Sequence, residues 1–142
     1  MIVLDASVAA KAYLEEAESD EAIALVTGEQ RLLAPELIRV EVAAALCRRA
    51  RKGELAGEEA KLRCEHWLAR LQKGLFRLTP DQDLLSDAIE LATGLKHPLQ
   101  DCLYLAAARR FDVPLITADR SFRDRAFPFD SRVALLAGCE RN

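Results

Sequence analysis

The chain has 142 residues, a hydrophobic fraction of 51%, a charged fraction of 30% and a formal net charge of -3. This length fits one domain with its own core, and the composition excludes disordered and collagen-like chains. The net charge excludes a molecule-wide cationic field, so any binding of nucleic acid depends on local basic clusters.

Short apolar segments alternate with longer segments of helical periodicity along the whole chain. In chain order, we expect a strand at residues 2–4, helices at 7–15 and 18–27, a strand at 32–34, helices at 35–52 and 58–73, a strand at 75–78, helices at 80–93 and 98–110, a strand at 113–117, a short helix after residue 119 and a strand at 132–135. This alternation predicts a single α/β domain over residues 1–142, with a mostly parallel sheet flanked by helices on both faces.

Capping and breaking residues set the expected helix boundaries. Ser7 and Thr79 are expected N-caps, and Pro35 and Pro80 stand where a helix begins. Gly94 is expected to end the helix that starts near Pro80.

The four cysteines are far apart and form no CxxC pair, so a zinc site is not expected: Cys47, Cys64, Cys102 and Cys139. No apolar run approaches the roughly 20 residues of a membrane-spanning helix. We expect no signal peptide ahead of Asp5. We therefore expect a cytoplasmic protein with reduced thiols and no membrane segment.

Two aspartates follow expected strands. Asp5 ends the run "MIVLD", and Asp119 comes just beyond the strand at 113–117 in "PLITADRSF". Ligands of open α/β sheets bind outside the carboxyl ends of the strands, so the two acids are expected at one shared site. Each also has an ordinary explanation, since Asp5 can form an Asx turn and Asp119 can cap the helix after it.

Two further acids lie on expected helices. Glu41 interrupts the apolar stretch "VEVAAALC", where a buried charge requires a cation, a metal or hydrogen-bond donors. Its ordinary explanation is an ion pair with Arg48 or Arg49. Asp101 comes early in the helix that starts near Pro98, where the helix dipole alone favours a negative charge.

Together, Asp5, Glu41, Asp101 and Asp119 are expected to converge as a carboxylate cluster at the carboxyl edge of the sheet. Ionised carboxylates in a small volume repel one another, so such a cluster implies bound cations. Ligand sets made only of oxygen select hard metals, here Mg²⁺ or Mn²⁺. These ions support in-line displacement at phosphorus, which is the chemistry of nucleases.

The sequence resembles the PIN-domain family, and more narrowly the VapC-type toxins of type II toxin–antitoxin pairs. The matching pieces are "IVLDASV", "LLAPELIRVEVAAAL", "HPLQDCLYLAAARR" and "PLITADRSF", in the family's order and spacing over essentially the whole chain. The resemblance implies an Mg²⁺- or Mn²⁺-dependent endoribonuclease whose acidic metal-binding set is Asp5, Glu41, Asp101 and Asp119.

The resemblance also implies supporting and partner features. Ser7 and Thr117 occupy hydroxyl positions around the metal, and Asp124 is a candidate for an additional carboxylate. Implied partners are a VapB-like antitoxin, an RNA substrate and a second copy in a homodimer. Four arginines are hypothetical contacts with the RNA backbone because they cluster near the expected site: Arg48, Arg49, Arg120 and Arg123.

Three alternatives stay open on the residues. A receiver-like phosphotransfer domain shares an α/β fold and a magnesium site, but it requires a late lysine, and no lysine follows Lys96. A haloacid-dehalogenase-like phosphatase requires an aspartate where Ser7 stands. A catalytically silent PIN-fold protein-binding module is disfavoured by the complete acidic set.

Overall fold

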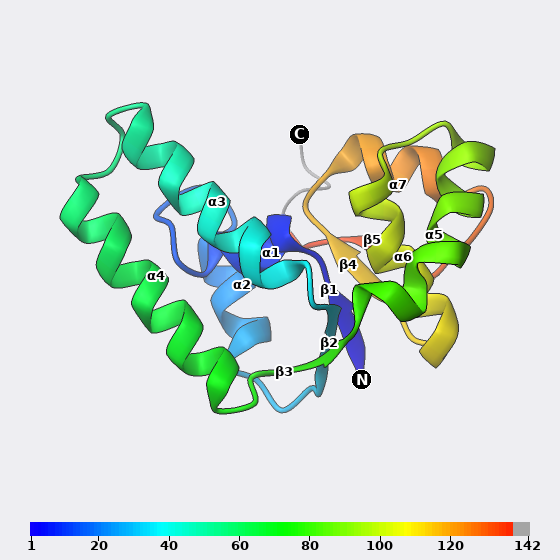
Figure 1. Ribbon diagram of the computed structural model, residues 1–142, viewed down its shortest axis with the longest axis horizontal. Coiled ribbons are helices and arrows are strands. Elements are labelled where there is room, and N and C mark those ends of the chain that lie inside the picture. Colours follow the sequence, from blue (N-terminus) through cyan, green and yellow to red (C-terminus); the bar gives the residue numbers. More distant parts are fainter. Residues whose placement is uncertain (138–142) are drawn as a thin grey trace.

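The computed structural model describes residues 1–137 and centres on a parallel five-stranded sheet (Figure 1). Its strands are β1 (Ile2–Leu4), β2 (Leu32–Pro35), β3 (Phe76–Thr79), β4 (Leu115–Thr117) and β5 (Val133–Leu135). They lie in the order β3-β2-β1-β4-β5, with β1 in the centre. Receiver-like folds have the order 2-1-3-4-5, so the receiver-like alternative does not fit this sheet.

The central strands are short apolar runs because helices cover both faces of the sheet. Every residue of β1 and β2 is buried. In the register, Val3 of β1 lies opposite Leu33 of β2 and Leu115 of β4. Since all the strands are parallel, their carboxyl ends form one edge, and Asp5 and Asp119 follow β1 and β4 at that edge.

Seven helices are seen in residues 1–137: α1 (Ala6–Lys11), α2 (Ser19–Val26), α3 (Ile38–Arg51), α4 (Gly57–Gln72), α5 (Asp81–Leu95), α6 (Leu99–Phe111) and α7 (Arg120–Ala126). Helix α6 packs across β1, β2 and β4, and α5 packs on α6. Figure 1 shows α1, α2 and the α3–α4 hairpin on the opposite side of the sheet. The expected α/β architecture, with a parallel sheet between two helical layers, is confirmed.

Aromatic side chains join the α3–α4 hairpin to the rest of the core. Trp67 of α4 is fully buried and contacts Tyr13 and Phe76 edge to face, with ring centroids 5.6 and 6.0 Å apart. Its indole N–H donates to the carbonyl of Arg39 at 3.2 Å, which satisfies the polar end of the buried ring.

Two expected boundaries near the N-terminus are wrong. The N-cap of α1 is Asp5, whose side chain accepts a hydrogen bond from the backbone N–H of Val8, whereas Ser7 lies inside the helix. Helix α1 also ends at Lys11 instead of residue 15. The Ser19 hydroxyl donates to the Leu14 carbonyl at 2.6 Å and holds the intervening segment in a turn.

Proline and glycine signals were also misassigned. Pro35 ends β2, and α3 begins only after Leu37, whose backbone N–H donates to Asp81 at 3.0 Å. Helix α5 continues through Gly94 so that Leu95 can be buried, and it ends at Lys96 with a left-handed φ of 53°.

Two more boundaries, at the end of β3 and at the start of β4, differ from those expected. Thr79, the expected N-cap of α5, belongs to β3. Pro80, expected as the first helical residue, is the N-cap instead, so α5 begins one residue later than predicted. Strand β4 starts at Leu115 because the backbone N–H of Val113 still bonds the helical carbonyl of Ala108 at 3.0 Å.

Three of the four cysteines lie within the residues that the structure describes. Cys47, Cys64 and Cys102 are free, and Cys139 lies outside the residues that the structure describes. Over residues 1–137, no helix is long and apolar enough to cross a membrane.

Candidate metal centre and nuclease site

All four predicted acids line one cavity at the carboxyl edge of the sheet. The cavity has a volume of about 550 Å³ and includes Asp5, Glu41, Asp101 and Asp119 among its lining residues. Four different elements bring them together, because two acids follow β1 and β4 and the other two lie in the first turns of α3 and α6. The four acids therefore share one cavity, as the sequence led us to expect.

Asp5 is the most buried of the four, at 3% exposed. The Ser7 hydroxyl donates to its Oδ1 at 2.5 Å, and the Val8 backbone N–H donates to the same oxygen at 3.2 Å. Burial raises the pKa of Asp5 to about 7, although hydrogen bonds from Ser7, Thr117 and Val8 oppose that shift and the charge of Asp101 adds to it. Among residues 1–137, no Lys or Arg side chain pairs with this carboxyl group to offset the effect of its burial.

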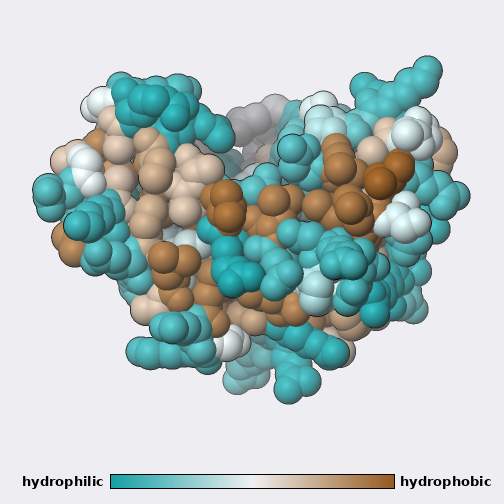
Figure 2. All heavy atoms as spheres, viewed as in Figure 1, coloured by the Kyte–Doolittle hydropathy of each residue, from teal (hydrophilic) through white to brown (hydrophobic). Residues whose placement is uncertain are grey.

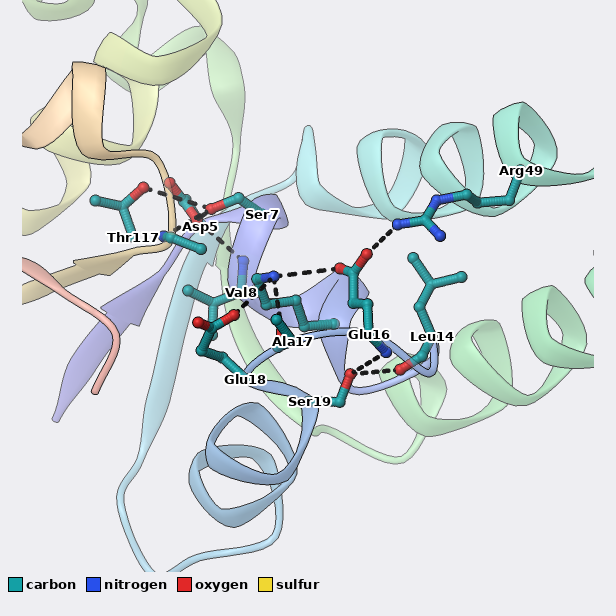
Figure 3. Close-up of polar contacts among 12 residues, drawn as sticks. Asp5, Ser7, Val8, Leu14, Glu16, Ala17, Glu18, Ser19, Arg49 and Thr117 are labelled. Carbon is teal, nitrogen blue, oxygen red and sulfur yellow. Dashed lines mark hydrogen bonds and ion pairs between the residues drawn. The ribbon is translucent and has the colours of Figure 1, made fainter. Parts of the chain in front are cut away.

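Ser7 and Thr117 connect the ends of β1 and β4 through their hydroxyl groups. The Ser7 Oγ lies 3.4 Å from the Thr117 Oγ1 and accepts from the backbone N–H of Ala118 at 2.9 Å. The Thr117 Oγ1 accepts from the backbone N–H of Asp119 at 3.0 Å. The two hydroxyls therefore hold the segment that follows β1 against the segment that follows β4 (Figure 3).

Glu41 is half-buried and forms no ion pair with Arg48 or Arg49, so the ordinary explanation of this acid does not hold. Its Oε1 accepts instead from the Tyr104 hydroxyl at 2.6 Å. Burial raises the pKa of Glu41, the hydrogen bond from Tyr104 lowers it, and the charge of Asp101 raises it further. The pKa of Tyr104 is raised by its own burial and by Glu41, which keeps the phenol protonated as a donor.

Asp101 lies in the first turn of α6, and its Oδ2 is 2.7 Å from Nε2 of His97. The imidazole stacks on the buried Phe122 ring, with centroids 4.9 Å apart. Burial raises the pKa of Asp101, His97 lowers it, and the charge of Asp119 raises it. Charge effects between Asp101 and each of the other three acids mark it as the centre of the acidic set.

Asp119 is the N-cap of α7, where its Oδ1 accepts from the backbone N–H of Phe122 at 3.1 Å. Both strand-end aspartates are thus helix caps, as the ordinary explanation expected of Asp119 but not of Asp5, for which it expected an Asx turn. Within residues 1–137, however, the second oxygens of Asp119, Glu41 and Asp101 accept no hydrogen bond from the protein. These oxygens remain available to a ligand in the cavity.

The donor set fits a hard divalent cation by its chemistry. Four carboxyl groups share one cavity, and over residues 1–137 none of them pairs with Lys or Arg, the one basic neighbour being the imidazole of His97 beside Asp101. Burial and mutual repulsion raise the pKa of three of them, as expected of carboxylates that lack a counter-ion. In the same part of the chain, no three His, Cys, Asp or Glu side chains are arranged to enclose an ion. Binding would thus require these side chains to turn toward one another.

Four basic residues also line this cavity, and we call them its basic side: Lys11, Arg48, Arg49 and Lys52. Arg48 and Arg49 are therefore placed where the sequence predicted them. Arg120, Arg123 and Asp124 are not among the residues that line the cavity. Asp124 is exposed and lies 2.9 Å from the guanidinium of Arg123.

Four residues of the site were missed at the sequence level. His97 precedes Asp101 by four residues and Tyr104 follows it by three, so helical spacing would have found both as neighbours of a candidate ligand. Lys11 and Glu16 carry no such signal, because Glu16 pairs with Arg49 of α3, which is distant in sequence, and Lys11 is linked to that arginine only through Glu16.

Comparisons with known proteins show the family to which this fold belongs. The family model described as PIN domain matches residues 2–128. A curated relative, Ribonuclease VapC3 of Pyrobaculum aerophilum, is 35% identical over 129 residues, which cover 89% of this chain and 95% of the relative.

Two solved structures share the fold at low sequence identity. The VapC20 toxin of Mycobacterium tuberculosis, described as cleaving the sarcin–ricin loop, superposes with a TM-score of 0.68 at 17% identity and covers 87% of this chain and 94% of its own. A toxin–antitoxin complex from Klebsiella pneumoniae gives a TM-score of 0.60 at 14% identity, covering 94% and 96%. By its family model, its curated relative and its sheet, this chain belongs to the PIN-domain family, among the VapC-type members.

Proposed function

We propose that this protein is an Mg²⁺- or Mn²⁺-dependent endoribonuclease that acts as the toxin of a toxin–antitoxin pair. The observation that supports this most is the convergence of four carboxyl groups on one cavity of a VapC-type PIN fold, with no Lys or Arg partner for any of them among residues 1–137. The 35% identical relative is named a ribonuclease, which supports the same reaction class.

Asp5, Glu41, Asp101 and Asp119 would hold the metal. A bound divalent cation lowers the pKa of a coordinated water and stabilises the charge that develops on a phosphodiester during displacement. The chain's own residues prepare the site, since Tyr104 fixes one oxygen of Glu41 and His97 fixes one oxygen of Asp101. Ser7 and Thr117 hold Asp5 in the same way from the strand ends.

The RNA backbone would lie along the basic side of the cavity. Arg48 is exposed there and has no ion-pair partner in residues 1–137, so its charge is available to a phosphate. Arg120 and Arg123 of α7 remain proposed contacts for RNA that extends beyond the cavity. Arg48→Met should lower the affinity for RNA more than Arg123→Met does. It should also make the slope of log affinity against log salt shallower than Arg123→Met does.

The proposed partners are a VapB-like antitoxin and a second copy of this chain. Helix α5 exposes Leu85 and Ile89 one turn apart, and Phe129 nearby is 70% exposed. Figure 2 shows hydrophobic side chains gathered over the region of α5 and α6 and flanked by hydrophilic ones. We propose this face for the homodimer, so Ile89→Asp should shift the mass measured by light scattering from dimer to monomer, whereas Val40→Asp on α3 should not.

The antitoxin would keep this nuclease inactive. We propose a cytoplasmic location, where RNA substrates are present and thiols stay reduced. The experiment that tests the function is cleavage of a mixed RNA pool by antitoxin-free protein, with Mn²⁺ and with chelator. We expect metal-dependent cutting by the wild type and by Asp124→Asn, and none by Asp5→Asn. Equal cutting by Asp5→Asn and by the wild type would refute the proposed site.

A protein that cuts no RNA at all is distinguished by calorimetric titration with Mn²⁺. Saturable binding that is lost in Asp5→Asn would leave the metal site in place and point to an RNA target that the pool lacks. No saturable heat would support the alternative of a catalytically silent protein-binding module.

A further inference from the structure

A carboxylate of the protein itself bridges two cations at the basic side of the cavity. Glu16 lies in the segment between α1 and α2 and lines the cavity together with Lys11 and Arg49. Its Oε1 is 3.4 Å from Nζ of Lys11, and its Oε2 pairs with Nη2 of Arg49. Figure 3 shows Glu16 extending from this segment toward Arg49 of α3.

The two cations do not depend on Glu16 for their positions. The Nζ of Lys11 also donates to the carbonyl of Ala17 at 2.9 Å and lies 3.6 Å from the carboxylate of Glu18. The Nε of Arg49 lies 3.4 Å from the carboxylate of Glu54. Neither Ala17, Glu18 nor Glu54 lines the cavity, so these contacts would persist if Glu16 turned away.

We propose that Lys11 and Arg49 form a phosphate-binding subsite that Glu16 occupies in the free protein and that an RNA backbone phosphate takes over on binding. Each oxygen of Glu16 meets a different cation, and a phosphodiester likewise presents two charged non-bridging oxygens. The subsite lines the same cavity as the four acids, so it would hold a phosphate next to the one that is cleaved. This inference rests on the proposed ribonuclease function.

Glu16 then acts as an internal competitor of the substrate. An RNA phosphate reaches Lys11 and Arg49 only when the ion pairs of Glu16 break, and it also meets repulsion from that carboxylate. Partly exposed ion pairs of this kind carry modest energies, so the competition would tune affinity and not abolish it. The arrangement would favour a strand of several phosphates over a single free anion, because only a strand is also held by its neighbouring contacts.

The test is the affinity of a short single-stranded oligoribonucleotide, measured by fluorescence anisotropy in chelator so that no cleavage occurs. We expect Glu16→Gln to bind about two- to fivefold more tightly than the wild type at low ionic strength. The slope of log affinity against log salt should steepen by about 0.7 if one more phosphate is engaged. Arg49→Met combined with Glu16→Gln should lose the gain, and inorganic phosphate alone should compete only weakly.

Glu54→Gln is the matched control, because it removes the same charge from the same arginine outside the cavity. The subsite is overturned if Glu16→Gln binds RNA no better than Glu54→Gln does, even when the wild type cleaves RNA with metal. Conversely, tighter binding by Glu16→Gln together with no metal-dependent cleavage would leave the subsite standing and refute the proposed nuclease activity.

Discussion

Replacing Asp5 by asparagine should stabilise the metal-free protein, and the gain should depend on pH. Asp5 is 3% exposed and its pKa is about 7 in the folded protein, against an ordinary value of 3.8. Between these values the folded protein holds a proton that the unfolded chain releases, so the free energy of unfolding falls as pH rises from about 4 to about 7. Asparagine carries no charge and removes this loss, while its side-chain oxygen still accepts from Ser7 and Val8.

The magnitude follows from the difference between the two pKa values. About three pKa units correspond to at most about 4 kcal/mol, and we expect about 2–4 kcal/mol at pH 8. For a domain of this size that is a rise in Tm of about 6–12 °C. Below about pH 4 the wild type and Asp5→Asn should melt together, because both side chains are then neutral.

Thermal unfolding followed by circular dichroism from pH 4 to pH 8 in chelator measures the effect, with Asp124→Asn as the exposed control. A variant less stable than the wild type at pH 8, or a difference in Tm that does not change with pH, would refute the reasoning. Mn²⁺ at 1,000 times its Kd should reverse the order, because it adds about 4.1 kcal/mol to the wild type alone.

Three further substitutions separate roles within the site and the core. Tyr104→Phe keeps the buried ring but removes the hydrogen bond to Glu41, and we expect a loss of about 1–2 kcal/mol in unfolding free energy together with weaker Mn²⁺ binding by calorimetry. Asp119→Asn should preserve the cap on Phe122 and Tm, whereas Asp119→Ala should cost about 1 kcal/mol, and both should abolish RNA cleavage. Trp67→Ala should cost about 3–5 kcal/mol in chemical denaturation because the ring is fully buried.

The strands and the acids that follow them could be predicted because each has a local cause. An apolar run that stops at Asp5 reads as a buried strand with a polar end, and the same pattern recurs before Asp119. Boundaries were less predictable where a distant group decides them. Helix α3 starts after Leu37 because Asp81, from another helix, accepts its backbone N–H.

The ligand candidates could be predicted as a set, but their partners could not. Glu41 interrupts an apolar stretch, which shows that something must compensate its charge. Arg48 and Arg49, further along the same helix, were the expected partners, yet the partner is Tyr104, which α6 brings across the cavity. Arg48 lines the same cavity as Glu41, but it lies two turns, about 10 Å, further along α3, so the two side chains share a helix face without pairing.

Capping and metal binding are compatible uses of the same two aspartates. The caps use Oδ1 of Asp5 and of Asp119, each accepting a backbone N–H of the helix that follows. A carboxylate has about four acceptor positions on two oxygens, so a cap leaves capacity for a ligand and also fixes the direction in which that capacity points. Evidence that Asp119 stabilises α7 would therefore not count against its role in cleavage. Asparagine separates the two roles, since it keeps the capping oxygen and removes the negative charge, whereas alanine removes both and cannot distinguish them.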